Sequence, residues 1–108
     1  MNRGELWVSA DTGHASKPRP MLIIQSDRHN KDDSVITCLV TSHKVNLIDV
    51  EYRVELPRTP ENGLVIDSYV MLDKLVAVPR RRLNKLIGKV DSEKLKEIHG
   101  RIMDFLDE

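Results

Sequence analysis

Polar side chains suited to phosphate chemistry stand beside two apolar segments of this sequence. Arg19 directly precedes the apolar run 20–24 and lies between two prolines, which restrict the backbone at that point. The second apolar run, 35–40, is directly followed by the polar residues Thr41, Ser42, His43 and Lys44, and His14 lies in the polar segment before Arg19. If the two runs pair as strands with suitable ends together, Arg19 and Thr41 meet at one rim of the sheet.

The same side-chain types meet the needs of RNA cleavage without a metal ion. A 2'-hydroxyl must lose a proton and attack the neighbouring phosphorus, and the crowded transition state carries extra negative charge. Arginine suits that charge because it stays protonated and presents a planar fork of N–H donors to phosphate oxygens. The leaving 5'-oxygen then needs a proton donor, a role that histidine often fills near neutral pH.

Each of these residues also has a plainer interpretation. An arginine at the start of a strand is often solvated or held in a surface salt bridge. Thr41 and Ser42 could cap a turn, and His14 could simply be exposed. The arginine triplet 80–82 could contact RNA phosphates or form a solvated turn. The residues by themselves therefore indicate a small β-rich domain with a basic rim, and they leave both interpretations open.

The elements that must position these residues are mostly strands. Apolar runs and period-2 alternation predict short strand segments at 5–8, 20–24, 35–40, 52–56, 64–66, 69–72 and 75–78. A helical turn is expected at 26–30 and a proline-rich turn at 57–63, while 41–49 is mixed and could add an edge strand. We expect a mainly β fold, curled into a small and mostly antiparallel barrel.

The end of the chain changes to a helical period. Apolar residues recur there at steps of three and four, at Leu95, Ile98, Ile102 and Phe105 or Leu106. Asp91 or Ser92 supplies the N-cap of this helix. Its apolar stripe is expected to pack on the sheet.

Composition narrows the class of protein. The 108 residues form one domain, 1–108, and 17 basic residues balance 17 acidic ones, which argues against nucleic-acid binding by bulk charge. Cys38 is the single cysteine, expected to be a buried apolar residue, and it indicates a reducing cytoplasm. The histidines lack the spacing of metal ligands, and the sequence has no nucleotide-binding glycine loop. Neither a signal peptide nor a membrane span is visible.

Several motifs in this order resemble the MazF/PemK family of toxin endoribonucleases, which includes Kid. The opening Arg3-Gly4-Glu5-Leu6-Trp7 is similar to the family's R-G-[ED]-[IV]-[WY]. The segment from Arg19 to Asp27 is similar to R-P-x-[LV]-[IV]-[IV]-Q-[NS]-D, and 35–42 to a strand ending in L-T-S. Further similar stretches are 52–56 to H-V-E-[LI], 61–70 to E-N-G-L…D-S-x-[VI], and 81–90 to the later R-L…[IL]-G-x-[LV] motif. The resemblance spans nearly the whole chain.

The resemblance implies an SH3-like curled antiparallel barrel of the MazF/CcdB type with a C-terminal helix, paired as a homodimer. It also implies sequence-selective, metal-independent cleavage of single-stranded RNA, chiefly mRNA, that leaves a 2',3'-cyclic phosphate and a 5'-hydroxyl. No cofactor is expected. The implied partner is a cognate antitoxin whose disordered, acidic tail covers the RNA groove, and the implied location is the cytoplasm.

Site residues follow from the same resemblance. Arg19 corresponds to the transition-state cation and Thr41 to its companion, while His14 and Asp73 match positions that the Kid-like branch assigns to RNA chemistry or contact. The residues expected to bind RNA are Lys17, Gln25, Ser42, His43, Lys44, Lys74 and Arg81.

The chain departs from the family pattern at several positions. The loop from Gly13 to Arg19 is short and lacks the usual Glu-Gln pair, and the stretch 73–77 lacks the usual Gln, Arg and Thr. The Kid-like branch has an arginine two residues before the aspartate, where this chain has Met71. Lys74 is a candidate to replace part of that positive charge.

Two other functions compete with the nuclease. A gyrase-inhibiting toxin of the CcdB type shares a similar barrel, but it does not need Arg19 or Thr41, and the end of this chain lacks the Trp-Gly-Ile that we associate with that type. A catalytically inactive RNA- or peptide-binding barrel is the third alternative, supported by the altered stretch 73–77.

Overall fold

The fold is a single antiparallel sheet that curls over two hydrophobic clusters and carries one helix. A computed structural model of the chain describes residues 1–9, 19–29, 32–43 and 50–107. Its strands are β1 (Glu5–Ser9), β2 (Pro20–Ile23), β3 (Ser34–Thr41), β4 (Arg53–Leu56), β5 (Ser68–Pro79) and β6 (Leu83–Lys89). Short 3-10 helices form at η1 (Asp27–His29), η2 (Val50–Tyr52) and η3 (Arg80–Arg82), and α1 (Ser92–Leu106) follows the last strand.

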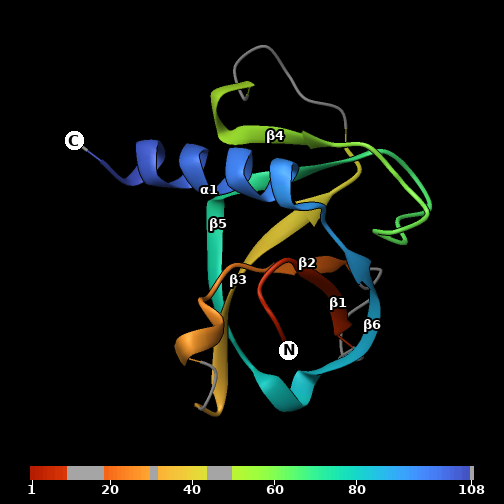
Figure 1. Ribbon diagram of the computed structural model, residues 1–108, viewed down its shortest axis with the longest axis vertical. Coiled ribbons are helices and arrows are strands. Elements are labelled where there is room, and N and C mark those ends of the chain that lie inside the picture. The colour runs from red at the N-terminus through yellow and green to blue at the C-terminus, as the bar shows by residue number, and fades with distance from the viewer. Residues whose placement is uncertain (10–18, 30–31, 44–49, 108) are drawn as a thin grey trace.

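The strands pair in the order β4-β5-β3-β2-β1-β6, and every pairing is antiparallel. In Figure 1, β1, β2 and β6 curl around the N-terminus at one end of the molecule, while α1 lies along β4 and β5 at the other. The two outermost strands, β4 and β6, are not paired with each other, so the sheet is curled like a barrel without closing. The expected mainly β fold with a terminal helix is confirmed.

A bend in β5 divides the sheet into its two halves. Cys38 of β3 pairs with Leu75, but Val40, two residues later, pairs with Val70, so residues 71–74 stand across from Leu39 alone. Extra residues in one strand of a pair bend it and re-aim its side chains. The Met71 carbonyl, at the start of this bend, accepts a hydrogen bond from the Cys38 thiol at 2.8 Å. Asp73 and Lys74 lie in this bend.

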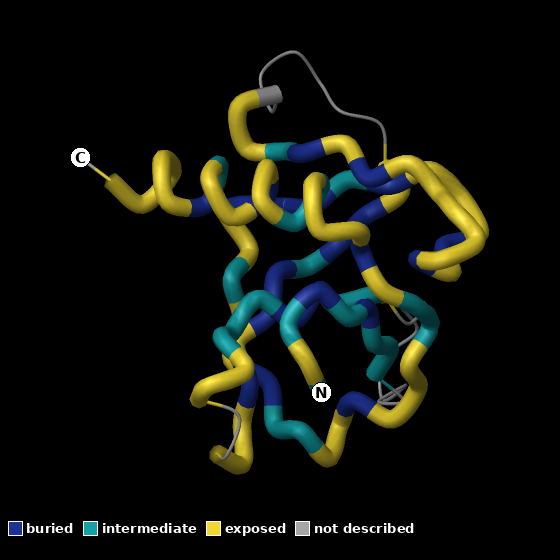
Figure 2. The backbone as a smooth tube through the Cα atoms, viewed as in Figure 1, coloured by how far each residue is buried: buried dark blue, intermediate teal, exposed yellow. Residues whose placement is uncertain are grey.

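The core consists of two clusters on opposite faces of the sheet. The larger packs beneath α1 and contains buried residues of five strands and of the helix, including Leu22, Val40, Val54, Val70 and Ile98. The smaller fills the curl of the sheet with Ile23, Val35, Val78 and Leu83, and Trp7 packs against it. Figure 2 shows the buried positions running along the strands, while the outer side of α1 and the turn after β4 are exposed.

The helix α1 begins at the position predicted from the sequence. Asp91 is the N-cap, and its carboxylate accepts a hydrogen bond from the Lys94 N–H at 2.9 Å. Ile98 and Ile102 are its buried residues, and they pack into the larger cluster. The remaining turns project outward, where Phe105 meets the ring of Tyr52 edge to face, with ring centroids 5.4 Å apart.

Three strand assignments differ from expectation. Residues 64–66 were expected to form a strand but do not, because only Leu64 is buried while Val65 is 88% exposed. The segments 69–72 and 75–78 are one continuous strand, since the bend interrupts the alternation without ending the pairing. The strand β6 was not expected, because its exposed and half-buried residues do not alternate and it contains Gly88. The possible edge strand at 44–49 lies outside the described residues.

Candidate active site

Arg19 and Thr41 lie at the same end of the paired strands β2 and β3. Met21 pairs with Leu39 at this end of the two strands, and Arg19 precedes that pair by two residues while Thr41 follows it by two. Arg19 is exposed and directly precedes β2, while Thr41 is the last residue of β3. Both residues therefore belong to the same end of this strand pair.

Thr41 is held tightly at this rim. It is 7% exposed, and its hydroxyl oxygen accepts a hydrogen bond from the His43 N–H at 3.2 Å. The turn-capping interpretation of Thr41 is thus correct as a description of its local structure. It does not exclude a role in the site, because a hydroxyl that accepts one hydrogen bond still has its own proton to donate. Ser42 and His43 follow and are exposed.

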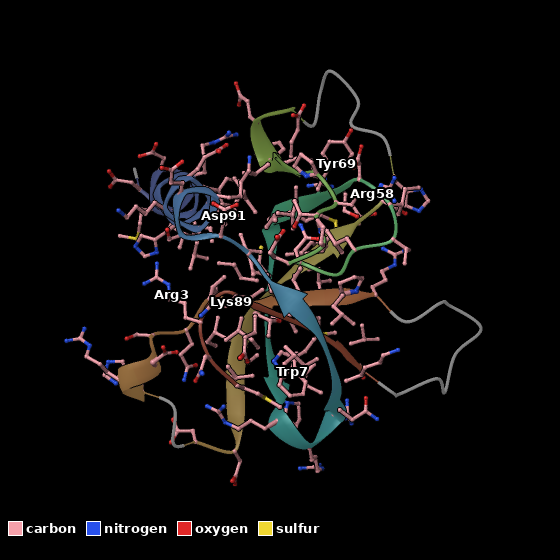
Figure 3. The ribbon with its side chains drawn as sticks, turned by 45° about the vertical axis from the view of Figure 1, so that its right-hand side comes forward. Arg3, Trp7, Arg58, Tyr69, Lys89 and Asp91 are labelled. Atoms are coloured by element: carbon pink, nitrogen blue, oxygen red, sulfur yellow. The ribbon has the colours of Figure 1, made fainter. Side chains whose placement is uncertain are left out.

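A row of side chains crosses the sheet from this rim. Thr41 pairs with Tyr69 on β5, and Tyr69 pairs with Glu55 on β4. Directly paired residues of neighbouring strands share a face of the sheet, so Thr41, Tyr69 and Glu55 form one row, which together with Arg19 at its Thr41 end is called here the site row. Figure 3 shows Tyr69 at the β4–β5 end of the molecule, well separated from Trp7 in the curl at the other end. The alternate residues Val40, Val70 and Val54 are buried in the larger cluster behind the row.

An ion pair borders the site row. Arg53 lies two residues before Glu55 on β4, and its Nη1 donates to the Asp73 carboxylate at 2.7 Å. Arg53 pairs across the strands with Met71. The position where the family pattern has an arginine therefore faces a guanidinium that comes from the neighbouring strand. Lys74 is exposed beside Asp73.

Two of the expected RNA-binding residues lie elsewhere. Gln25 follows the far end of β2, on the order of 20 Å along the strand from Arg19. Its amide is engaged within the protein, since Nε2 donates to the His29 carbonyl and Oε1 accepts from the Ile36 N–H at 3.1 Å. Arg81 belongs to η3 beyond the far end of β5, where Pro79 pairs with Ser34. The structure therefore separates Gln25 and Arg81 from the site row, and Gln25 fastens the η1 turn to β3.

Three further candidates, His14, Lys17 and Lys44, lie outside the described residues. Conversely, Tyr69, Glu55 and Arg53 belong to the site row or its border, and sequence reasoning missed them. The alternation in 52–56 already indicated that Arg53 and Glu55 share one face. What the sequence did not supply was the pairing of β4 with β5, which brings that face beside Thr41.

The buried thiol is not part of this chemistry. Cys38 is fully buried, and burial, together with the nearby Asp73 carboxylate, raises its pKa to about 12, although the Arg53 guanidinium lowers it in part. A thiol that stays protonated is a poor nucleophile. Within the described ranges no group of three or more His, Cys, Asp or Glu side chains could hold a metal ion, and no helix there is long and apolar enough to cross a membrane.

A pocket of about 270 Å³ opens at the other side of β4. It is lined by Leu56, by turn residues between 57 and 62, and by the start of α1 with Asp91 and Lys94. None of its lining residues belongs to the site row, so the pocket is separate from Arg19 and Thr41.

A protein-family model matches nearly the whole chain. That model describes a PemK-like, MazF-like toxin of a type II toxin–antitoxin system, and it matches residues 2–106. The chain belongs to this toxin family.

Relatives of the MazF toxin agree with the assignment. A probable endoribonuclease MazF of Mycolicibacterium smegmatis is 33% identical over 107 residues, covering 98% of this chain and 96% of that protein. An endoribonuclease MazF of Staphylococcus saprophyticus is 25% identical and covers 94% of this chain and 88% of that protein.

Solved structures share the fold of this MazF-type toxin. A mycobacterial endoribonuclease in complex with its cognate antitoxin has a TM-score of 0.79 at 20% identity, covering 98% of this chain and 94% of that one. A MazE-MazF structure from Deinococcus radiodurans has a TM-score of 0.76 at 22% identity, covering 98% of this chain and 94% of that one. At these identities the likeness establishes the curled barrel with its terminal helix, and the family assignment establishes the toxin.

Proposed function

We propose that this MazF-type toxin is an endoribonuclease that cuts single-stranded RNA, chiefly mRNA, at selected sequences and without a metal ion. The observation that supports the proposal is the antiparallel pairing of β2 with β3, which leaves Arg19 and Thr41 at the same end of the two strands. The family and the relatives named endoribonuclease MazF support the enzyme class. The whole chain, residues 1–108, acts as one toxin domain.

In the proposed reaction, the RNA strand lies across the site row with its scissile phosphate between Arg19 and Thr41. The 2'-hydroxyl oxygen bonds to phosphorus as the bond from phosphorus to the 5'-oxygen breaks, which leaves a 2',3'-cyclic phosphate and a 5'-hydroxyl. Arg19 binds the non-bridging oxygens and stabilises the added charge, since a fixed guanidinium is worth more at a transition state than mobile water. The Thr41 hydroxyl donates to the same phosphate.

Two proton transfers complete the reaction. One proton leaves the 2'-hydroxyl and another reaches the 5'-oxygen. The resemblance assigns His14 and Asp73 to this part of the site. We propose His14 as a proton carrier, because an imidazole titrates near neutral pH. The Asp73 carboxylate accepts a hydrogen bond from Arg53, and we propose that it orients that side chain.

Partners follow from the family. We propose that the toxin pairs as a homodimer in the cytoplasm and that a cognate antitoxin neutralises it by laying an acidic segment over the site row. A mycobacterial endoribonuclease with the same fold is described in complex with its cognate antitoxin. An acidic segment is a physical competitor of RNA, because both present anions to Arg19.

The decisive experiment incubates the purified protein with a long single-stranded RNA in the presence of EDTA, beside an Arg19→Ala variant, and maps the product ends. Discrete cuts by the wild type alone, with 5'-hydroxyl ends, are expected. Cutting by Arg19→Ala at the wild-type rate would contradict the assigned role, and inhibition by EDTA would contradict metal independence. If the wild type cuts nothing, a gyrase supercoiling assay tests the CcdB-type alternative and RNA binding tests the inactive barrel.

A further inference from the structure

The ion pair that borders the site row engages only one of the two terminal nitrogens of the Arg53 guanidinium among the residues that the structure describes. Arg53 Nη1 donates to the Asp73 carboxylate at 2.7 Å and to the Tyr52 carbonyl at 3.3 Å. Among the residues that the structure describes, none accepts a hydrogen bond from Nε or Nη2 of Arg53. A guanidinium has five N–H donors, and one edge of it, with Nε and Nη2, forms the fork that grips a phosphate or carboxylate through two bonds. Within the described ranges, that edge of Arg53 has no acceptor.

The Arg53 side chain is partly exposed to solvent. The Arg53 side chain is 17% exposed and that of Asp73 33% exposed. The only buried side-chain nitrogen or oxygen that lacks a partner within the described ranges is Nη2 of Arg80, which lies at the far end of the sheet. Nε and Nη2 of Arg53, which have no partner in the described part of the chain, are therefore not buried, and their side chain is oriented by Asp73 and Tyr52.

Arg53 lies on the same face of the sheet as the site row. It lies two residues before Glu55 on β4, and side chains two apart in a strand share a face, so Arg53 faces the same side as the site row. The row from Arg19 to Glu55 crosses three strand spacings of about 4.8 Å, which puts the backbones of Arg19 and Arg53 on the order of 15 Å apart. At that separation, the two guanidiniums serve different phosphates of one strand.

We propose that Arg53, held in place by Asp73, is a second phosphate-binding residue of the toxin and anchors the RNA strand beside the cleavage site. Nothing in this role involves the reacting atoms, so Arg53 lowers the KM for RNA and leaves kcat to Arg19 and Thr41. Asp73 is the positioning residue that orients the guanidinium. Lys74, the sequence-based candidate for replacing the missing charge, has no described partner to orient it and is the weaker anchor.

The inference rests on the proposed function, and its test separates the two. The probe is a short fluorescein-labelled single-stranded RNA that contains a mapped cleavage site with 2'-deoxyribose at the scissile position, so that it binds without being cut. Equilibrium binding is measured over a range of salt concentrations for the wild type, Arg53→Ala, Arg53→Lys and Asp73→Asn. Cleavage of the unmodified RNA by the same proteins supplies kcat and KM, and circular dichroism verifies the fold of each variant.

We expect Arg53→Ala to weaken binding and raise KM by about tenfold, the loss of one charged hydrogen-bonded contact, with kcat within about threefold of the wild type. The slope of log affinity against log salt should fall by about 0.7, the value for one phosphate contact on a single strand. Arg53→Lys should keep the salt slope but recover only part of the affinity, because lysine lacks the fork. Asp73→Asn should weaken binding while the slope stays unchanged.

Arg101→Ala is the matched control. Arg101 on α1 also donates to a carbonyl of η2, from Nη2 to Glu51 at 3.2 Å, so its removal costs one positive charge and one bond to the same turn. The RNA affinity of Arg101→Ala and its salt dependence should equal those of the wild type. Wild-type affinity and slope in Arg53→Ala, with RNA still bound by the wild type, would overturn the inference alone. A wild type that neither binds nor cuts RNA would overturn the proposed function and this inference together.

Discussion

Gly88 on β6 lies against the backbone of Asn62 in the turn after β4. A Cβ added to Gly88 would stand 2.2 Å from the carbonyl carbon of Asn62. The turn is also tied to β6 by the Lys89 N–H, which donates to the Glu61 carbonyl at 2.9 Å. Asn62 itself is 3% exposed, and its side chain accepts from the Thr59 and Leu64 N–H groups at 3.0 Å each. This contact joins the two edge strands of the curled sheet through a turn, without pairing them.

Gly88→Ala should therefore destabilise the protein by about 3 kcal/mol, since a methyl group here meets backbone that cannot move independently. Urea unfolding followed by circular dichroism measures the change. Gly100→Ala on α1 is the control of opposite sign: an added Cβ meets nothing within 4 Å. It should stabilise the helix by up to about 1 kcal/mol. Equal stability of Gly88→Ala and wild type would show that the turn moves freely away from β6.

The N-cap of α1 gives a second prediction about stability. Asp91→Ala removes the carboxylate that accepts from the Lys94 N–H and should cost about 1 kcal/mol. Ser92→Ala, at the first helical residue, should change the free energy of unfolding by less than about 0.5 kcal/mol, as for an ordinary surface substitution. A larger loss for Ser92→Ala than for Asp91→Ala would assign the cap to serine. Thermal unfolding of the two variants in parallel decides between them.

Cys38 should resist alkylation in the folded protein. Its thiol is buried, donates to the Met71 carbonyl, and has a pKa raised to about 12 from 9.0. Iodoacetamide at pH 8 should label it only after urea unfolds the chain, as mass spectrometry can measure. Rapid labelling of the native protein would mean that the bend in β5 opens readily.

The same thiol predicts a pH dependence of stability. Because the folded pKa lies above the unfolded one, the unfolded chain loses the proton first as pH rises. The contribution of Cys38 to stability is therefore constant below pH 9 and decreases between about pH 9 and 12. Urea unfolding at a series of alkaline pH values should show this decrease, and a Cys38→Ala variant should lack that part of it.

Thr41 supplies a prediction about activity. Thr41→Val keeps the shape of a buried side chain but removes the hydroxyl, so cleavage should slow by about 100-fold, as for loss of one donor to a transition-state oxyanion. Thr41→Ser keeps the hydroxyl and should retain most of the rate. The comparison is made from single-turnover cleavage rates, with binding of the 2'-deoxy probe as the control for the His43 turn. Equal rates for the valine and serine variants would remove Thr41 from the chemistry.

The helix and the positions of most strands along the chain could be predicted from the sequence, because they depend on local signals. The apolar runs of β2 and β3 and the period-2 alternation of β4 identify strands wherever they pair, and the Asp91 cap with its apolar stripe identifies α1. The burial of Cys38 followed from the apolar run around it. Arg19 and Thr41 were recognisable for a similar reason, since each borders a buried strand and side chains at strand ends project from the sheet.

Only the tertiary structure decided which other residues lie beside Thr41. Strand pairing is a non-local choice, and register depends on the contacts of whole faces, so the sequence could not bring Tyr69, Glu55 and Arg53 beside Thr41. The bend that aims Asp73 at Arg53 arises because residues 71–74 oppose only Leu39, which no local pattern encodes. Gln25 follows the far end of β2 and Arg81 follows the far end of β5, so both residues lie away from the site row. The sequence by itself determined the chemical side chains and the strands that carry them, while the pairing of those strands determined which side chains share a face and can act on one RNA strand.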